Sequence, residues 1–377
     1  NLYDHFEEFN FTTDESSPEY EQIAIDPEML GRVFESLLAT QVDETGQQAR
    51  KAKGAFYTPR EIVSYMCKES LRNYLYNAVN NDEGTKESID SLLDITDSEW
   101  AKSKSNTLRD KVKDNRTQII DALDAVTILD PACGSGAFLI EVFDYLEKEW
   151  DAAKEYNQTR NFQLECNWTS DEILNNNIFG VDKNHEAVEI TKLSLWLKKR
   201  SLDNTLKENI KHGNSYSFDW NKEFPHCNGK FDIVITNPPW GATFTREEKE
   251  SVNKIEMKAI SKDSYFYFLK IAMSICNPDG YISMLLPKSW LNLKTANHIR
   301  EEILTQKELK TICSFDGAGF KILVEFAAVI FKNSGSFNDS AKYLGINQNL
   351  EKVFENNIFV GENYNILIES NPKIEEI

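Results

Sequence analysis

The residues best suited to chemistry are Asn237-Pro238-Pro239-Trp240. They stand at the end of a mainly apolar run that begins at residue 231. Proline has no backbone N–H, so this turn offers carbonyl oxygens that can only accept hydrogen bonds. The side-chain oxygen of Asn237 and the carbonyl of Pro238 can together accept from an NH2 group such as the exocyclic amine of adenine. That contact favours a pyramidal nitrogen with an available lone pair, and Trp240 can stack on a base taken out of a duplex. The motif therefore predicts direct methyl transfer to an amino nitrogen, driven by positioning and electrostatics.

Other readings of the sequence compete with this one. The tetrapeptide could be a structural proline turn capped by a core tryptophan. A C5-cytosine enzyme needs a cysteine nucleophile, typically in a Pro-Cys pair, and the sequence has no such dipeptide. The five histidines form no ligand-spaced pair and the six cysteines form no CxxC motif, so no metal site or disulfide framework is predicted.

Residues 127–139 read as an apolar strand, a tight glycine turn and the start of a helix. Gly134 and Gly136 allow the backbone to pass close to a ligand, and the helix N-terminus that follows suits a carboxylate. A GxG turn alone is weak evidence, but the string from Asp130 to Phe138 is more specific. A dinucleotide fingerprint would require a third glycine where Leu139 stands. Cys133 is interpreted as a small packing residue within this loop.

Two later strand ends add polar side chains to the predicted site. Asp182 ends the run 178–182, where its carboxylate can accept from both hydroxyls of a ribose, or can cap the following helix. Asn214 ends the run 210–214, where its amide can read the edge of an adenine, or can form a turn. The sequence leaves both pairs of alternatives open.

From about residue 125 the pattern alternates between strands and helices, which predicts a mostly parallel sheet covered on both faces. Ligands bind such sheets at the carboxyl ends of the strands, where the motifs fall. The predicted strands are 125–130, 178–182, 210–214, 231–237, 281–287, 309–315 and 326–332, and the predicted helices are 136–150, 185–200, 264–276 and 294–304. A further helix is expected from Pro59 onward, with Thr58 as its N-cap. The segments 80–122 and 151–176 are interpreted as insertions, the first of them helical.

Charge bears on possible partners. The formal net charge is −19, and residues 1–49 hold twelve acidic residues and one basic residue, Arg32. Such a balance is unfavourable for binding DNA, so phosphate contacts would come from local basic patches or from parts of the protein outside this chain. Asn1 rather than methionine opens the chain, which suggests a piece of a longer protein. The sequence shows no membrane span or secretion signal, and together with the scattered cysteines this predicts a cytoplasmic protein.

In its motifs the chain resembles the γ-class amino DNA methyltransferases, and more closely the methylase portion of fused type IIG restriction–modification enzymes. The likeness covers residues 26–332 and includes the segments 26–35, 54–59, 130–138, 180–196, 237–240 and 280–290. It implies a Rossmann-like S-adenosylmethionine-dependent methyltransferase fold: a seven-stranded mixed sheet flanked by helices, with an N-terminal helical region. The implied divisions are residues 1–124 as that helical region, 125–335 as the catalytic domain, and 336–377 as the start of a segment leading to a target-recognition domain.

The resemblance also implies S-adenosylmethionine as cofactor and a flipped adenine in double-stranded DNA as substrate. The TP segment would contact the methionine part, the glycine loop the amino-acid end, Asp182 the ribose and Asn214 the adenine ring. The implied catalytic residues are Asn237, Pro238, Pro239 and Trp240, and the implied cofactor-binding residues are Tyr57, Thr58, Asp130, Ala132, Cys133, Gly134, Gly136, Phe138, Asp182, Lys183 and Asn214. A second base-stacking aromatic residue, a recognition domain and a nuclease motif are not identified.

The sequence is compatible with three other functions. A type I modification subunit shares the TP, GSG and NPP elements but tends to have phenylalanine after NPP. A protein glutamine methyltransferase holds an amide NH2 with the same device but usually lacks the Tyr57-Thr58-Pro59 element. A catalytically silent DNA-binding or scaffold module would keep the fold alone. Residues 241–262 are predicted to be a mobile loop that orders over the flipped base.

Overall fold

The computed structural model describes residues 29–31, 33, 58–79, 116–159, 170–199, 208–241, 244–252, 263–315, 325–335, 341–346 and 362–366. Within them the strands are β1 (Ile128–Asp130), β2 (Ile178–Asp182), β3 (Ile210–His212), β4 (Phe231–Thr236), β5 (Cys276–Pro287), β6 (Glu308–Phe315), β7 (Phe326–Lys332), β8 (Ala341–Ile346) and β9 (Glu362–Ile366). The α-helices are α4 (Arg60–Ala78), α8 (Arg116–Ala125), α9 (Ala137–Thr159), α10 (Ser170–Asn176), α11 (His185–Lys199), α13 (Trp220–Glu223), α14 (Arg246–Val252), α15 (Ser264–Ile275) and α16 (Asn297–Gln306). Short 3₁₀ helices are η1 (Pro225–Cys227), η2 (Lys288–Leu291) and η3 (Lys294–Ala296).

The strands form one mixed sheet in the order β3-β2-β1-β4-β5-β7-β6-β8-β9. The first five strands in this order pair in parallel. Strand β7 runs antiparallel to both β5 and β6. The parallel part reverses its direction of progression between β1 and β4, and a crevice at the carboxyl ends of the strands is expected at such a point.

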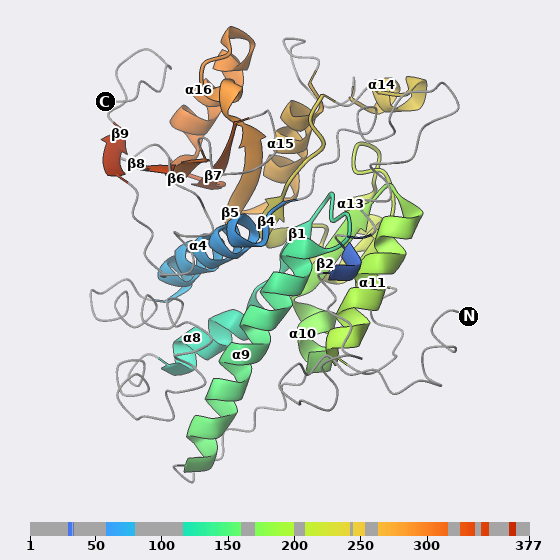
Figure 1. The fold of residues 1–377 in the computed structure, drawn as a ribbon, viewed down its shortest axis with the longest axis vertical. Coiled ribbons are helices and arrows are strands. Elements are labelled where there is room, and N and C mark those ends of the chain that lie inside the picture. The colour runs from blue at the N-terminus through green and yellow to red at the C-terminus, as the bar shows by residue number, and fades with distance from the viewer. Residues whose placement is uncertain are drawn as a thin grey trace.

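Helices cover the sheet because its strands are apolar on both faces. Nearly every residue of β1, β2, β4 and β7 is buried, as expected for strands in the middle layer of an α/β fold. Helix α4 packs against β4, β5 and α9, while α9 packs against α11 and α15 against β4 and β5. In Figure 1 α4 lies next to β4 and β5, and α9 runs downward from the same region.

The predicted α/β fold is confirmed, with small differences at the ends of elements. Strands β2 and β7 have the predicted bounds, whereas β1 is shorter because α8 continues through Ala125. Strands β8 and β9 were not predicted and extend the seven expected strands at one edge. They come from the segment 336–377. The predicted domain boundaries stay a prediction, although α4, N-terminal to the proposed boundary, shares one core with the sheet.

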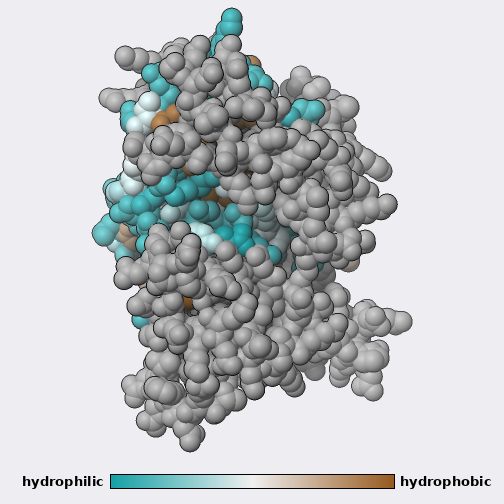
Figure 2. Space-filling model, turned by 90° about the vertical axis from the view of Figure 1, so that its left-hand side faces the viewer, coloured by the Kyte–Doolittle hydropathy of each residue, from teal (hydrophilic) through white to brown (hydrophobic). Residues whose placement is uncertain are grey.

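The surface of the described residues is mainly hydrophilic, as expected for an α/β fold whose apolar side chains are buried. On the side of the molecule in Figure 2 the described residues are mainly hydrophilic, with only small hydrophobic areas among them. Large exposed hydrophobic side chains in the described part are Met29, Val33 and Leu293. None of the helices within the described ranges has the length and apolar character to cross a bilayer.

Candidate active site

Four neighbouring parallel strands bring the predicted motifs to one edge of the sheet. Ile128 of β1 pairs with Ile178 of β2 and with Ile233 of β4, and Asp182 at the end of β2 pairs with His212 of β3. Adjacent strands lie about 4.8 Å apart, so the residues following their carboxyl ends are neighbours. The glycine loop after β1, Asp182 after β2, Asn214 after β3 and Asn237 after β4 therefore gather at this edge.

The glycine loop has the backbone that its sequence predicts. Gly134 and Gly136 have φ of +54° and +89°, a region in which a side chain is strained. The Thr191 hydroxyl of α11 donates to the Gly134 carbonyl at 2.8 Å. From the N-terminal part of the chain, Gly31 lies so close that a Cβ there would stand 3.0 Å from the Ser135 hydroxyl oxygen. The loop is thus held by α11 on one side and by the segment around Gly31 on another.

Gly136 gives a prediction for cofactor binding. A Cβ at this position would lie 2.7 Å from Thr191 Cγ2, and Thr191 cannot move without breaking its bond to the loop. We expect Gly136→Ala to lower cofactor affinity at least about tenfold. It should also lower the free energy of unfolding by more than the roughly 1–2 kcal/mol that left-handed backbone strain alone would cost. Calorimetric titration and urea unfolding measure the two effects.

The matched control for this change is Gly335→Ala. Gly335 also has a positive φ, +99°, but a Cβ there would meet only Glu308 Cβ at 3.6 Å. This variant should show the backbone strain with unchanged cofactor affinity. Equal affinities for the Gly136→Ala variant and the wild type would refute the role of the loop.

Asp182 connects β2 to the glycine loop instead of capping α11. Its Oδ2 accepts from the Gly134 N–H at 2.9 Å and its Oδ1 from the Asn184 N–H at 2.7 Å. The N-cap alternative for Asp182 is wrong, because Asn184 Oδ1 accepts from the N–H groups of Glu186 and Ala187 at the start of the helix. Each carboxylate oxygen of Asp182 has a further lone pair, so this half-buried group can still accept from ribose hydroxyls.

Asp130, at the end of β1, is a buried carboxyl beside this loop. It is 1% exposed, and its Oδ1 accepts from the Ala132 N–H at 2.9 Å. Burial raises the pKa of Asp130 to about 7, whereas an aspartate in an unfolded chain has a pKa of about 3.9. The folded protein therefore holds this proton more tightly than the unfolded chain. The protonated Asp130 carboxyl therefore makes its full contribution to the free energy of unfolding below about pH 4, and this contribution is lost as the pH rises through the folded-state pKa.

Replacing Asp130 by asparagine tests this linkage. The amide keeps an oxygen for the Ala132 N–H but carries no charge at any pH. We expect the stability of the wild type relative to Asp130→Asn to fall by about 1 kcal/mol for each pH unit as the pH rises from about 5 to about 7. Urea unfolding of both proteins across this range measures the difference. Curves that stay parallel would contradict the raised pKa.

The predicted TP segment and the proline turn, 179 positions apart in the sequence, meet at the end of β4. Asn237 is half-buried, and its Nδ2 donates to the Thr58 hydroxyl at 2.9 Å. Thr58 is 6% exposed. The prediction that Thr58 caps the following helix is wrong, because Pro59 is the N-cap of α4 and its carbonyl accepts from Ile62 and Val63. The hydroxyl instead fixes the orientation of the Asn237 amide.

The remainder of the proline turn is tied to α15 and to the sheet. The Pro239 carbonyl accepts from the Ser264 hydroxyl, and the Gly241 N–H donates to Asp263 Oδ1 at 2.8 Å. Trp240 is 9% exposed, and its Nε1–H donates to the Leu285 carbonyl at 3.3 Å. Its ring packs 6.3 Å from that of Phe326. The tryptophan therefore belongs to the core in this conformation, with a small part of its surface accessible.

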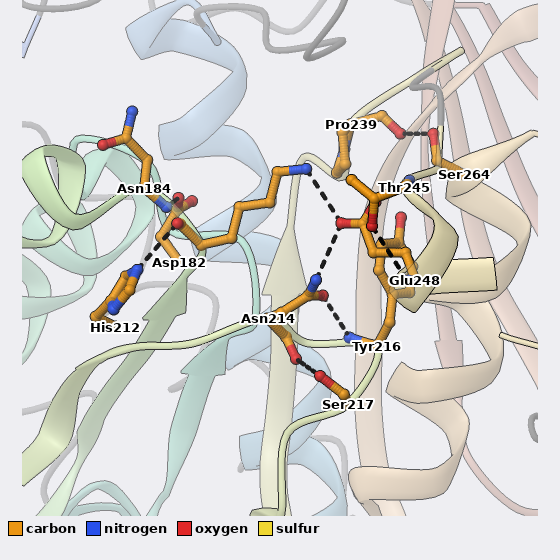
Figure 3. A network of polar contacts seen from close by, with 11 residues as sticks. Asp182, Asn184, His212, Asn214, Tyr216, Ser217, Pro239, Thr245, Glu248 and Ser264 are labelled. Carbon is orange, nitrogen blue, oxygen red and sulfur yellow. Dashed lines mark hydrogen bonds and ion pairs between the residues drawn. The ribbon is translucent and has the colours of Figure 1, made fainter. Parts of the chain in front are cut away.

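Asn214 forms a turn, which is one of the two roles predicted for it. Its Oδ1 accepts from the Tyr216 N–H at 3.1 Å, and its carbonyl accepts from the Ser217 N–H. Its Nδ2 donates to Glu248 Oε1 at 3.0 Å, and Lys183 Nζ lies 3.3 Å from the same oxygen. Figure 3 shows Asn214 and Glu248 facing each other near Asp182 and Pro239.

The other predicted site residues are distributed as follows. Ala132 is half-buried within the loop, and Phe138 is buried in the core. Burial, with the nearby Asp182 and Asp130 carboxylates, raises the pKa of the Cys133 thiol and keeps it protonated, in line with a packing role. Tyr57 lies outside the described residues. Residues 241–262 include helix α14, so the predicted mobile loop is partly helical, and its ordering over a base stays a prediction.

Sequence reasoning missed side chains that hold this site together. Thr191 and Glu248 are the main ones, and Ser215, whose hydroxyl donates to the Pro131 carbonyl, is another. Only the spacing Thr245-x-x-Glu248 gave a local signal, as a capping box. The partners of the other two are remote in the sequence.

Comparison with known proteins gives concordant matches. Residues 176–320 match the family described as Eco57I restriction-modification methylase. The type II methyltransferase M.VspI of Vibrio sp. (strain 343) is 25% identical over 295 residues, which cover 76% of this chain and 63% of that protein. The type II restriction enzyme and methyltransferase RM.Eco57I of Escherichia coli is 24% identical over 363 residues, covering 84% of this chain and 32% of that enzyme. The chain thus spans less than two thirds of the length of either relative.

A solved structure supports the fold. The cryo-EM structure of a DrdV–DNA complex superposes with a TM-score of 0.60 at 16% identity, covering 95% of this chain and 34% of that one. Together with the strand order, this agrees with the predicted Rossmann-like fold.

Proposed function

Because residues 176–320 match the family described as Eco57I restriction-modification methylase, we propose that this chain transfers a methyl group from S-adenosylmethionine to N6 of adenine in DNA. The observation that carries the proposal is the hydrogen bond from Asn237 Nδ2 to the Thr58 hydroxyl. That bond turns the nitrogen end of the amide toward Thr58 and so orients the oxygen end, which is the end that would accept from a substrate amine. The proline turn that follows adds carbonyl acceptors.

The residues at the sheet edge fit the proposed cofactor. The two positive-φ glycines and the start of α9 form a turn suited to the amino-acid end, and the half-buried Asp182 suits ribose hydroxyls. Lys183 and Asn214 would flank the adenosine end. When bound, S-adenosylmethionine supplies an electrophilic methyl group on a sulfonium centre.

The protein's own part in the reaction is positioning. Asn237 Oδ1 and the Pro238 carbonyl would each accept one hydrogen of the adenine amine, which favours a pyramidal nitrogen whose lone pair is less delocalised into the ring and more available for methylation. Fixed acceptors of this kind stabilise developing charge without reorganisation during the reaction. Trp240 would stack on the extruded base. At 9% exposure, more of its ring must be uncovered for this contact.

Restriction–modification methylases act on DNA, and the names of the two relatives include methyltransferase activity of type II systems. These relatives favour the type II reading over a type I modification subunit. With a formal net charge of −19, the chain would need local basic patches or further parts of the protein for firm phosphate contacts.

The test is methyl transfer from S-adenosylmethionine labelled in its methyl group to duplex DNA, RNA and protein. DNA digested to nucleosides should yield labelled N6-methyl-2′-deoxyadenosine, with none in RNA or protein. Label in N4-methylcytosine would overturn the adenine assignment, and label in protein glutamine would favour the glutamine methyltransferase reading. Cofactor binding without any transfer would leave a scaffold module as the better description.

A further inference from the structure

A carboxylate that follows the proline turn in the chain reaches back to two strand ends assigned to the cofactor. Glu248 lies on α14 and is 4% exposed. Its Oε1 accepts from Asn214 Nδ2 at 3.0 Å and lies 3.3 Å from Lys183 Nζ. Figure 3 shows the network, with Asn214 and Thr245 both joined to Glu248. One buried group thus joins the segments after β2, β3 and β4.

Helix capping explains the contacts of only one of the two carboxylate oxygens of Glu248. Glu248 Oε2 accepts from the Thr245 N–H at 2.8 Å, and the Glu248 N–H donates to Thr245 Oγ1 at 3.2 Å, which is a capping box. Capping requires one oxygen. Burial raises the pKa of Glu248, but the Thr245 N–H and the nearby Lys183 outweigh it and lower the pKa overall, so the group is charged at neutral pH. The second oxygen of a charged carboxylate is therefore directed at Lys183 and Asn214.

The position of this carboxylate is set by packing around α14. The helix has seven residues, too few to be stable alone. Before it, Phe244 packs edge-on against Tyr216 at 5.3 Å and against Tyr267 at 5.2 Å between ring centroids. Val252 at its end is 4% exposed. These contacts fix α14 against the segment that follows Asn214.

We propose that Glu248 is a positioning residue of the cofactor site, holding the Lys183 ammonium and the Asn214 amide at the adenosine end of S-adenosylmethionine. The proposal rests on the cofactor named under Proposed function. With Nδ2 bonded to Glu248 and Oδ1 to the Tyr216 N–H, the Asn214 side chain has one orientation. Lys183 has three ammonium hydrogens and Asn214 Nδ2 has two, so each can serve Glu248 and a ligand together.

The test is a double-mutant cycle on cofactor binding, measured by calorimetry with the full chain. Glu248→Gln keeps the size of the side chain and removes its charge, and Lys183→Met removes the cation. Each substitution is expected to raise the Kd for S-adenosylmethionine about tenfold. The double variant should have a Kd no higher than that of the single variant with the higher Kd, because the two residues act as one unit. Glu250→Gln is the matched control, since Glu250 lies on the same helix, exposed and 3.9 Å from Arg246. It should leave the Kd unchanged.

A second ligand separates positioning from a structural role. 5′-Methylthioadenosine contains the adenosine half but no amino acid, so Glu248→Gln should weaken both ligands by the same factor. A lower melting temperature with unchanged Kd values would overturn the proposal by assigning Glu248 to helix capping alone. Weakened binding of S-adenosylmethionine alone would overturn it too. Failure of the wild type to bind either ligand would refute the proposed function itself, and this distinguishes the two failures.

Discussion

Replacing Asn237 by alanine is expected to abolish methyl transfer while cofactor affinity stays within about threefold of the wild type. The substitution removes a fixed acceptor for the substrate amine, and loss of a single group of this kind costs about 100-fold or more in rate. The Asn237 side chain is tied to Thr58, while the glycine loop has its own supports in Thr191 and Asp182. Transfer to DNA at saturating cofactor measures the rate, and calorimetry measures the affinity.

Asn221→Ala provides the control for this experiment. Asn221 is exposed on α13, so the same chemical change there should alter neither quantity. A collapse of cofactor affinity in the Asn237→Ala variant would assign Asn237 to the cofactor pocket and remove the role given to its oxygen. Full activity would remove that role as well.

Replacing Thr58 by valine is expected to lower the rate of transfer at saturating cofactor by about 10-fold to 100-fold. Valine has nearly the same shape but no oxygen, so Asn237 Nδ2 loses the Thr58 hydroxyl as an acceptor at a partly buried site. An unsatisfied buried donor costs about 1–3 kcal/mol, and each 1.4 kcal/mol is a factor of about ten. The Asn237 amide then either keeps its orientation with this loss of stability or rotates. Rotation would turn its oxygen away from the substrate.

Thr58→Ser separates this role from the contact with the methionine end that the family resemblance implies. Serine keeps the hydroxyl, so the serine variant should retain most of the wild-type rate. We expect the valine variant to differ from it in kcat far more than in the KM for the cofactor. Similar rates in the two variants, or a loss confined to cofactor KM, would show that the hydroxyl does not orient Asn237.

Much of this site could be predicted because the sequence encodes it locally. The apolar run ending in Asn237, the two glycines after β1 and the acid that ends β2 each have their chemistry within a few consecutive residues. Strand β2 has its predicted bounds because a mainly apolar run of five residues has the length of a buried strand and is too short for a typical helix. Strands β8 and β9, Ala341–Ile346 and Glu362–Ile366, escaped prediction because both mix polar and apolar residues.

By itself, then, the sequence determined the α/β alternation, the glycine turn and the acceptor-rich turn after β4, since backbone preferences and apolar periodicity act over short distances. Only the tertiary structure decided which side chains complete the site. Thr58 meets Asn237 across 179 positions, Thr191 meets Gly134 across 57 and Glu248 meets Asn214 across 34. Such partners depend on the order of strands in the sheet and on how α4, α11 and α14 pack, and hydrogen-bonding groups choose among neighbours that only folding brings within reach.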